Sequence, residues 1–153
     1  ENIKVPIFAD PVSTAKAERL RCVLGRIHTL KPNRLEAELL SGVKITDQKS
    51  MERAARVLLD TGLRRVFLSL GEEGVYAADH NGTVRQPCLP AQMENATGAG
   101  DAFCAGVSIG LTYGKTMAEA IEIGSILAAS VITSSENVCP RFLPRELGLE
   151  IDV

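Results

Sequence analysis

The chain of 153 residues is long enough to form a domain with a sizeable hydrophobic core. With 45% hydrophobic and 24% charged residues and a formal net charge of −2, it offers no basic surface for nucleic acid, and no apolar run reaches the length of a membrane span. Its four cysteines have no C-x-x-C spacing, so we expect reduced thiols in a cytoplasmic protein without a cysteine metal site.

The first part of the chain predicts strands that alternate with helices. Short apolar runs indicate the strands, and apolar residues at helical spacing followed by glycine indicate helices and their ends. In chain order the expected elements are a strand over 5–9, a helix over 13–24 ended by Gly25, a strand over 27–30, a helix over 34–40 ended by Gly42, and a helix over 50–61 ended by Gly62.

The remaining elements complete an α/β pattern. Residues 65–70 form a nearly continuous apolar run, which is typical of a strand buried on both faces. Asn81-Gly82 predicts a hairpin between strands over 75–78 and 83–86, and helices rich in small residues are expected after Gly98 and over 116–133. We therefore expect an α/β layered fold with a mainly parallel sheet, flanking helices and an antiparallel hairpin at the edge.

Polar or glycine-rich segments follow the predicted parallel strands. Asp10, Asn33 and the run Ser69–Gly74 each come soon after an apolar run, and the segment Asn95–Phe103 opens a helix. Ligands of parallel sheets bind at the carboxyl ends of the strands. These segments therefore predict one active site at that edge of the sheet.

The segment Asn95–Phe103 combines small residues with a carboxylate. Thr97 is expected near the helix cap and Gly98 to Asp101 in the first turn, where backbone N–H groups without partners attract an anion. Because a carboxylate repels such an anion, Asp101 is either a base that removes a proton from a nucleophile or a residue that stabilises the helix dipole. The other loops expected at the same edge favour the catalytic interpretation.

Two further motifs are rejected because of their context. Gly110–Thr116 resembles a Walker A loop, but it is one residue short between its glycines and follows a helix instead of a strand. Gly98 and Gly100 resemble part of a dinucleotide fingerprint that lacks its third glycine and its preceding buried strand. His28 and His80 are isolated, and we do not expect either to take part in chemistry.

The ordered motifs together resemble those of the ribokinase-like (PfkB-type) carbohydrate and nucleoside kinases. That family carries a D-P motif, an N-x-x-E motif, an S/T-x-G-x-x-G loop and a G-A-G-D signature in this order. The matching segments are Asp10-Pro11, Asn33-Arg-Leu-Glu36, Ser69-Leu-Gly-Glu-Glu-Gly74 and Gly98-Ala-Gly-Asp101. Within the family, the segments 10–13, 28–38 and 95–102 are most similar to pseudouridine kinases.

The resemblance implies a phosphotransferase mechanism. Asp101 would be the general base that takes the proton from a sugar hydroxyl as this hydroxyl attacks the γ-phosphate of ATP. The N–H groups of Gly98, Ala99 and Gly100 would form the anion hole for the transferring phosphoryl group. Glu36 would act on Mg²⁺ through water, because Mg²⁺ keeps much of its hydration shell.

The resemblance also implies a nucleotide site and a cation site. The residues expected on the phosphate and ribose side of ATP are Asn33, Ser69, Gly71 and Gly74. Ser125 stands where ribokinases have an Asn near the adenine, so contacts to the base should differ. Many members use a monovalent cation, and Asn95 and Thr97 are the candidate contributors to a K⁺ site.

The resemblance covers the C-terminal half of the family's fold. The chain begins without Met, and the N-terminal sugar-binding motifs and lid of the family are not in it. We therefore expect residues 1–153 to be the C-terminal nucleotide-binding and catalytic portion of a larger kinase. The missing half would leave an apolar surface that could pair with a second copy in a homodimer.

The expected activity is transfer of the γ-phosphate of ATP to a sugar or nucleoside hydroxyl, with pseudouridine 5′-phosphate as the expected product. One alternative is a kinase of the same fold that acts on ribose, fructose phosphate or adenosine. Another is a catalytically silent nucleotide-binding or assembly module. The expected partners are small molecules, with no nucleic acid and no membrane.

Overall fold

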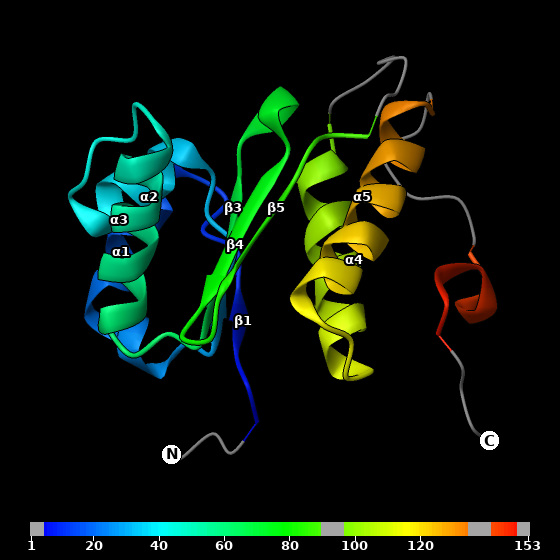
Figure 1. Ribbon diagram of the computed structural model, residues 1–153, viewed down its shortest axis with the longest axis horizontal. Helices are drawn as coiled ribbons and strands as arrows, with labels where there is room; N and C mark the ends of the chain where they lie inside the picture. Colours follow the sequence, from blue (N-terminus) through cyan, green and yellow to red (C-terminus); the bar gives the residue numbers. More distant parts are fainter. Residues whose placement is uncertain (1–4, 90–96, 135–141, 150–153) are drawn as a thin grey trace. The chain divides into compact units, whose positions relative to one another are not determined.

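The computed structural model describes residues 5–89, 97–134 and 142–149 of the chain (Figure 1). Its contacts divide the chain into two compact units, Glu1–Pro87 and Cys88–Val153, and each is described by itself. The first unit holds a sheet with three helices, and the second holds a pair of helices.

The sheet of the first unit has five strands that lie side by side in chain order. They are β1 (Phe8–Ala9), β2 (Thr29–Leu30), β3 (Arg65–Ser69), β4 (Val75–Asp79) and β5 (Thr83–Gln86). The first three are parallel to one another, whereas β4 pairs antiparallel with β3, and β5 pairs antiparallel with β4. The structure therefore confirms the α/β fold with an antiparallel hairpin at its edge.

Three helices cover one face of this sheet, as Figure 1 shows. They are α1 (Thr14–Leu20), α2 (Arg34–Ser41) and α3 (Gln48–Asp60). Crossover connections between parallel strands are right-handed, so successive crossovers in one direction place their helices on the same face. The fully buried members of the core between helices and sheet include Leu30, Leu58, Leu63, Val66 and Leu68.

Two predicted helix boundaries are wrong. The helix expected over 13–24 ends at Leu20, and a 3-10 stretch continues to Arg26. A Cβ at Gly25 would lie 2.7 Å from the Thr61 carbonyl oxygen, so this glycine permits a close backbone approach instead of ending α1. Helix α3 begins at Gln48 rather than at Ser50, because Asp47 accepts the Ser50 N–H at 2.8 Å and so caps the helix earlier.

The second unit contains α4 (Ala99–Thr112), α5 (Met117–Ile132) and a 3-10 turn over Pro144–Leu147. Both long helices confirm the sequence prediction. They pack so closely that a Cβ added at Gly106 would lie 2.6 Å from the Cα of Gly124. The small residues of this region therefore serve helix–helix contact, and Gly110, part of the rejected Walker-like motif, is a residue of α4 that packs against Ala120.

We predict that Gly106→Ala destabilises the protein by about 3 kcal/mol, at the upper end of the usual cost of overpacking, because the added methyl group meets backbone that cannot rotate away. Urea unfolding followed by circular dichroism measures the change. Gly82→Ala is the matched control, since a Cβ there meets nothing within 4 Å. Equal stability of the two variants would contradict the close packing of α4 on α5.

Candidate functional site

The carboxyl ends of β1, β2 and β3 lie at one edge of the sheet in the first unit. Ala9 is paired with Leu30, and Leu30 is paired with Val66, so the residues that follow each strand emerge together. Beyond β2, Asn33 forms a parallel bridge with Ser69, and the Ser69 N–H donates to the Pro32 carbonyl at 3.0 Å. The backbone therefore joins the start of the N-x-x-E motif to the start of the glycine loop.

The N-x-x-E motif is a reciprocal helix cap. The Asn33 side chain accepts the Glu36 N–H at 2.9 Å, and the Glu36 Oε2 accepts the Asn33 N–H at 2.9 Å. This capping box fixes both side chains at the N-terminus of α2, where the helix dipole favours a negative charge. Sequence analysis assigned both residues to a site but did not predict that they bond to each other.

The second carboxylate oxygen of Glu36 is the notable atom of this cap. Glu36 is only 1% exposed, and among the described residues its Oε1 is buried without a hydrogen-bond partner. Burying an ionised oxygen without a donor is costly, so such an atom points to a group that binds there. A hydrated cation fits this oxygen, since its water molecules would supply the missing donors.

The glycine loop after β3 folds back on itself. The Leu70 N–H donates to the Gly74 carbonyl at 2.9 Å, and the Gly74 N–H donates to the Gly71 carbonyl at 3.0 Å. Gly71 has φ +61° and Gly74 has φ +87° with ψ −134°, and residues with a Cβ adopt these conformations at a cost. Both glycines are therefore favoured by the backbone, and the turn follows Ser69, which is bridged to Asn33.

The D-P motif forms a buried ion pair. Asp10 Oδ2 lies 2.9 Å from Lys31 Nζ, with side-chain exposures of 17% and 6%. Asp10 Oδ1 also accepts the Val12 N–H at 3.0 Å, and Val12 has φ +66°, a strained conformation for a β-branched residue. A buried ammonium needs a counter-charge, so Asp10 neutralises Lys31 at the sheet edge. Sequence analysis missed Lys31, because a lysine after a strand has no distinctive pattern.

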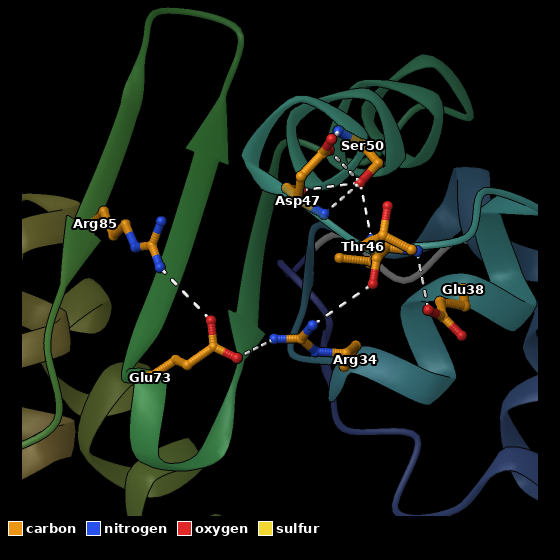
Figure 2. Close-up of polar contacts among 8 residues, drawn as sticks. Arg34, Glu38, Thr46, Asp47, Ser50, Glu73 and Arg85 are labelled. Carbon is orange, nitrogen blue, oxygen red and sulfur yellow. Dashed lines mark hydrogen bonds and ion pairs between the residues drawn. The ribbon is translucent and has the colours of Figure 1, made fainter.

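Glu73, within the glycine loop, contacts two arginines (Figure 2). Its Oε1 pairs with Nη2 of Arg34, in the first turn of α2, and its Oε2 lies 3.7 Å from Nη2 of Arg85, on β5. Arg34 Nη1 also donates to the Ile45 carbonyl at 3.5 Å. Sequence analysis missed this cluster, because its members lie far apart in the chain and the loop motif leaves their identity open.

Glu38, on α2, forms hydrogen bonds to the segment that connects α2 with α3, beside this cluster (Figure 2). It accepts the Lys44 ammonium at 2.6 Å and the Ile45 N–H at 2.9 Å. The hydrogen bond from Lys44, followed by that from Ile45, lowers the pKa of Glu38. Residues 42–47 are therefore held from both sides, by Glu38 at the Ile45 N–H and by Arg34 at the Ile45 carbonyl.

The G-A-G-D segment of the second unit opens α4. Gly98, with φ +86°, is the N-cap, and Thr97 directly precedes it, near the cap as expected. The first helical hydrogen bond runs from the Ala102 N–H to the Gly98 carbonyl at 2.9 Å, which leaves the N–H groups of Ala99, Gly100 and Asp101 without a helical acceptor.

The other predicted site residues of this unit are placed as follows. Asp101 is exposed in the first turn of α4, and Ser125 is partly buried on α5. Thr97 is exposed, whereas Asn95 lies outside the described residues. The structure thus brings Asn33, Glu36, Ser69, Gly71 and Gly74 together in the first unit, and Gly98 to Asp101 in one turn of the second.

The described residues contain no group of three or more His, Cys, Asp and Glu that could hold a metal ion. Cys22 and Cys88 are exposed free thiols. None of the helices in the described ranges is long and apolar enough to cross a bilayer.

His28, at the other end of β2, is a structural histidine. Its Nδ1 lies 2.9 Å from the Thr29 Oγ1, and its carbonyl accepts the N–H groups of Arg64 and Arg65 at 2.9 and 3.2 Å. Burial lowers the pKa of His28, and the charges of Arg65 and Arg64 lower it further. These surroundings favour the neutral imidazole.

The chain is similar to known carbohydrate kinases. A family model described as pfkB family carbohydrate kinase matches residues 1–139. The pseudouridine kinase of Escherichia coli (strain K12) is 42% identical over 118 residues, which cover 76% of this chain and 38% of that protein.

Solved structures share the fold. A protein from Clostridium perfringens assigned as a sugar kinase has a TM-score of 0.88 and 30% identity, over 94% of this chain and 46% of that one. Ribokinase from Thermotoga maritima has a TM-score of 0.75 and 27% identity, over 89% and 45%. The chain therefore spans less than half the length of each of these relatives.

We predict that His28 makes folding pH-dependent. Because its folded pKa lies below the ordinary value of 6.5, the unfolded chain takes up a proton first as the pH falls. The contribution of neutral His28 to the unfolding free energy is complete above pH 6.5, the ordinary pKa, and is lost as the pH falls through the lower pKa of the folded state. His28→Asn should flatten the dependence of the unfolding free energy on pH in that window.

Urea unfolding at a series of pH values between about 5 and 7.5, around the ordinary histidine pKa, tests this dependence. His80→Gln, which replaces the chain's other histidine at an exposed turn, is the control. An unchanged slope in His28→Asn would show that another group carries the pH dependence.

Proposed function

The chain belongs to the pfkB family of carbohydrate kinases, and on that basis we propose that it forms the ATP-binding and catalytic part of a kinase acting on a sugar or nucleoside hydroxyl. The observation that carries the proposal is the buried, half-satisfied carboxylate of Glu36, which the Asn33–Ser69 bridge holds beside the glycine loop. A nucleoside triphosphate with its bound cation would use this combination: an acidic group for the cation and a backbone that the phosphates can approach closely.

The proposal assigns residues 1–153 to the C-terminal portion of a longer kinase. The support is the partial coverage of its relatives, since the chain spans 38% of the pseudouridine kinase and 46% of the Clostridium perfringens protein. The acceptor sugar would then be bound mainly by residues outside this chain.

The first unit supplies the donor side of the proposed reaction. Asn33, Ser69, Gly71 and Gly74 would line the phosphates and ribose of ATP, and glycines allow the backbone to approach the phosphates closely. Glu36 would hold Mg²⁺ through water at Oε1. When bound, this cation would neutralise charge that develops on the phosphate oxygens.

The second unit supplies the transfer step. The N–H groups of Ala99 and Gly100, together with that of the cap residue Gly98, would stabilise the transferring phosphoryl group. The Asp101 carboxylate would accept the proton of the acceptor hydroxyl as its oxygen bonds to the γ-phosphorus and the bond to ADP breaks. Asp101 would thus act on the acceptor hydroxyl, whereas the N–H groups would act on the phosphoryl group. This division of roles explains why a carboxylate lies next to an anion site.

Pseudouridine is the acceptor that the identity of 42% to the Escherichia coli pseudouridine kinase favours. A kinase of the same fold with another acceptor, such as ribose, is the second candidate, because the Thermotoga maritima ribokinase shares 27% identity and the fold. Ser125 would lie near the adenine. Asn95 and Thr97 would contribute to a K⁺ site next to the anion hole.

We predict that Asp101→Asn lowers kcat of the full-length protein by about 10²- to 10⁴-fold, the range for loss of a general base, while ATP binding is retained. Steady-state kinetics with a panel of nucleosides and sugars, and calorimetry with ATP·Mg²⁺, measure the two effects. Glu122→Gln, an exposed carboxylate of the same unit, is the control. Near-normal turnover in Asp101→Asn would refute the assignment.

We also predict that Glu36→Gln raises the Mg²⁺ concentration for half-maximal activity about tenfold, because an amide oxygen can replace Oε2 in the cap but carries no charge toward the cation. A Mg²⁺ titration at saturating ATP measures the shift. Glu38→Gln, two residues along the same helix, is the control, since Glu38 bonds to Lys44 and Ile45. The same requirement in both variants would exclude Glu36 from the cation site.

A further inference from the structure

We propose that Glu73 is a positioning residue for the nucleotide: its carboxylate fixes the glycine turn Gly71–Gly74 to the first turn of α2. This inference rests on the proposed function, and it concerns a side chain for which the loop motif specifies no residue type. The residue acts through the backbone of the turn and does not itself touch the nucleotide.

The first observation is that both oxygens of Glu73 are engaged by different elements. Oε1 pairs with Arg34 of α2 and Oε2 with Arg85 of β5, so the carboxylate joins a helix, a loop and a strand (Figure 2). Arg34 directly follows Asn33, the N-cap of α2 that is hydrogen-bonded to the buried Glu36. The ion pair therefore sets the spacing between the two parts of the proposed nucleotide site.

The second observation is that the backbone hydrogen bonds of the turn do not connect it to α2 or β5. The backbone hydrogen bonds of residues 71–74 run within the turn itself, to Leu70, Gly71 and Gly74. Among the described residues, residues 71–74 are joined to α2 and β5 by the ion pairs of Glu73 and by no other hydrogen bond or ion pair. The β3–β4 pairing of Ser69 with Val75 closes the base of the turn, so the ion pairs of Glu73 are what fix its position relative to α2 and β5.

The third observation separates positioning from stability. The side chains of Glu73, Arg34 and Arg85 are 56%, 35% and 45% exposed, and exposed ion pairs contribute little to the stability of a fold. The same pairs can still order a loop before it binds a ligand, which lowers the entropic cost of binding. Loss of Glu73 should therefore weaken nucleotide binding while global stability and the rate of the bound complex stay nearly unchanged.

The chain offers a matched control. Glu72 is the preceding residue of the same turn, carries the same charge and is exposed, and it forms none of the ion pairs of Glu73. Glu73→Gln and Glu72→Gln remove equal charge near the nucleotide, so a difference between them reports the arginine contacts and not the net charge.

The experiment uses the full-length protein. Calorimetry gives Kd for ATP·Mg²⁺, steady-state kinetics give kcat and the KM for ATP, and hydrogen exchange gives the protection of the Gly74 N–H, which donates to Gly71. For Glu73→Gln we expect Kd and KM to rise about three- to tenfold, as for an ordering cost of about 1 kcal/mol. We expect kcat within twofold of the wild type and faster exchange at Gly74, with Glu72→Gln close to the wild type throughout.

Arg34→Ala combined with Glu73→Gln should weaken binding by less than the sum of the two single effects, because each single variant already removes the Arg34–Glu73 contact. Kd values of Glu73→Gln and Glu72→Gln that agree within twofold would overturn the inference, as would a fall in kcat with unchanged KM. If the wild-type protein binds no nucleotide, the proposed function itself fails. If the wild type is active and Glu73→Gln binds ATP·Mg²⁺ equally well, only the inference about Glu73 fails.

Discussion

The reciprocal cap between Asn33 and Glu36 is the contact on which the proposed site depends. It uses one carboxylate oxygen and the Asn33 amide to begin α2, and leaves the other carboxylate oxygen buried without a donor among the described residues. The parallel bridge between Asn33 and Ser69 then fixes the start of the glycine loop beside this cap. The helix cap and the strand register together place the unpartnered carboxylate oxygen of Glu36 close to the start of the glycine loop.

The neighbouring contacts follow from the same edge of the sheet. Because β1, β2 and β3 are parallel, Asp10 reaches Lys31, and the buried ammonium is neutralised where the chain leaves two strands. Arg34 extends from the cap to Glu73 and to the Ile45 carbonyl, so the helix start, the glycine loop and the connection to α3 are linked. In the second unit, Gly98 caps α4 and Asp101 lies in the first turn of that helix.

Local patterns were sufficient to predict most of the fold. The apolar run at Arg65–Leu70, the Asn81-Gly82 turn and the helix end at Gly42 each depend on a few neighbouring residues, and the structure confirms them. Contacts between distant segments were not predictable in this way: the pattern around Gly25 predicts a helix end, whereas in the structure this glycine makes a close tertiary approach to Thr61. Likewise the motifs identified Asn33, Glu36 and the loop glycines, whereas Lys31 and the Arg34–Glu73–Arg85 cluster depend on the strand order.

The central claim is that the free oxygen of Glu36 and the loop beside it form the donor side of a kinase site. A crystal structure of the full-length protein with Mg²⁺ and a non-hydrolysable ATP analogue tests it most directly. We predict a water of the Mg²⁺ shell on Glu36 Oε1 and the nucleotide phosphates against the turn Gly71–Gly74. A nucleotide bound elsewhere, with Glu36 Oε1 still without a donor, would contradict the claim.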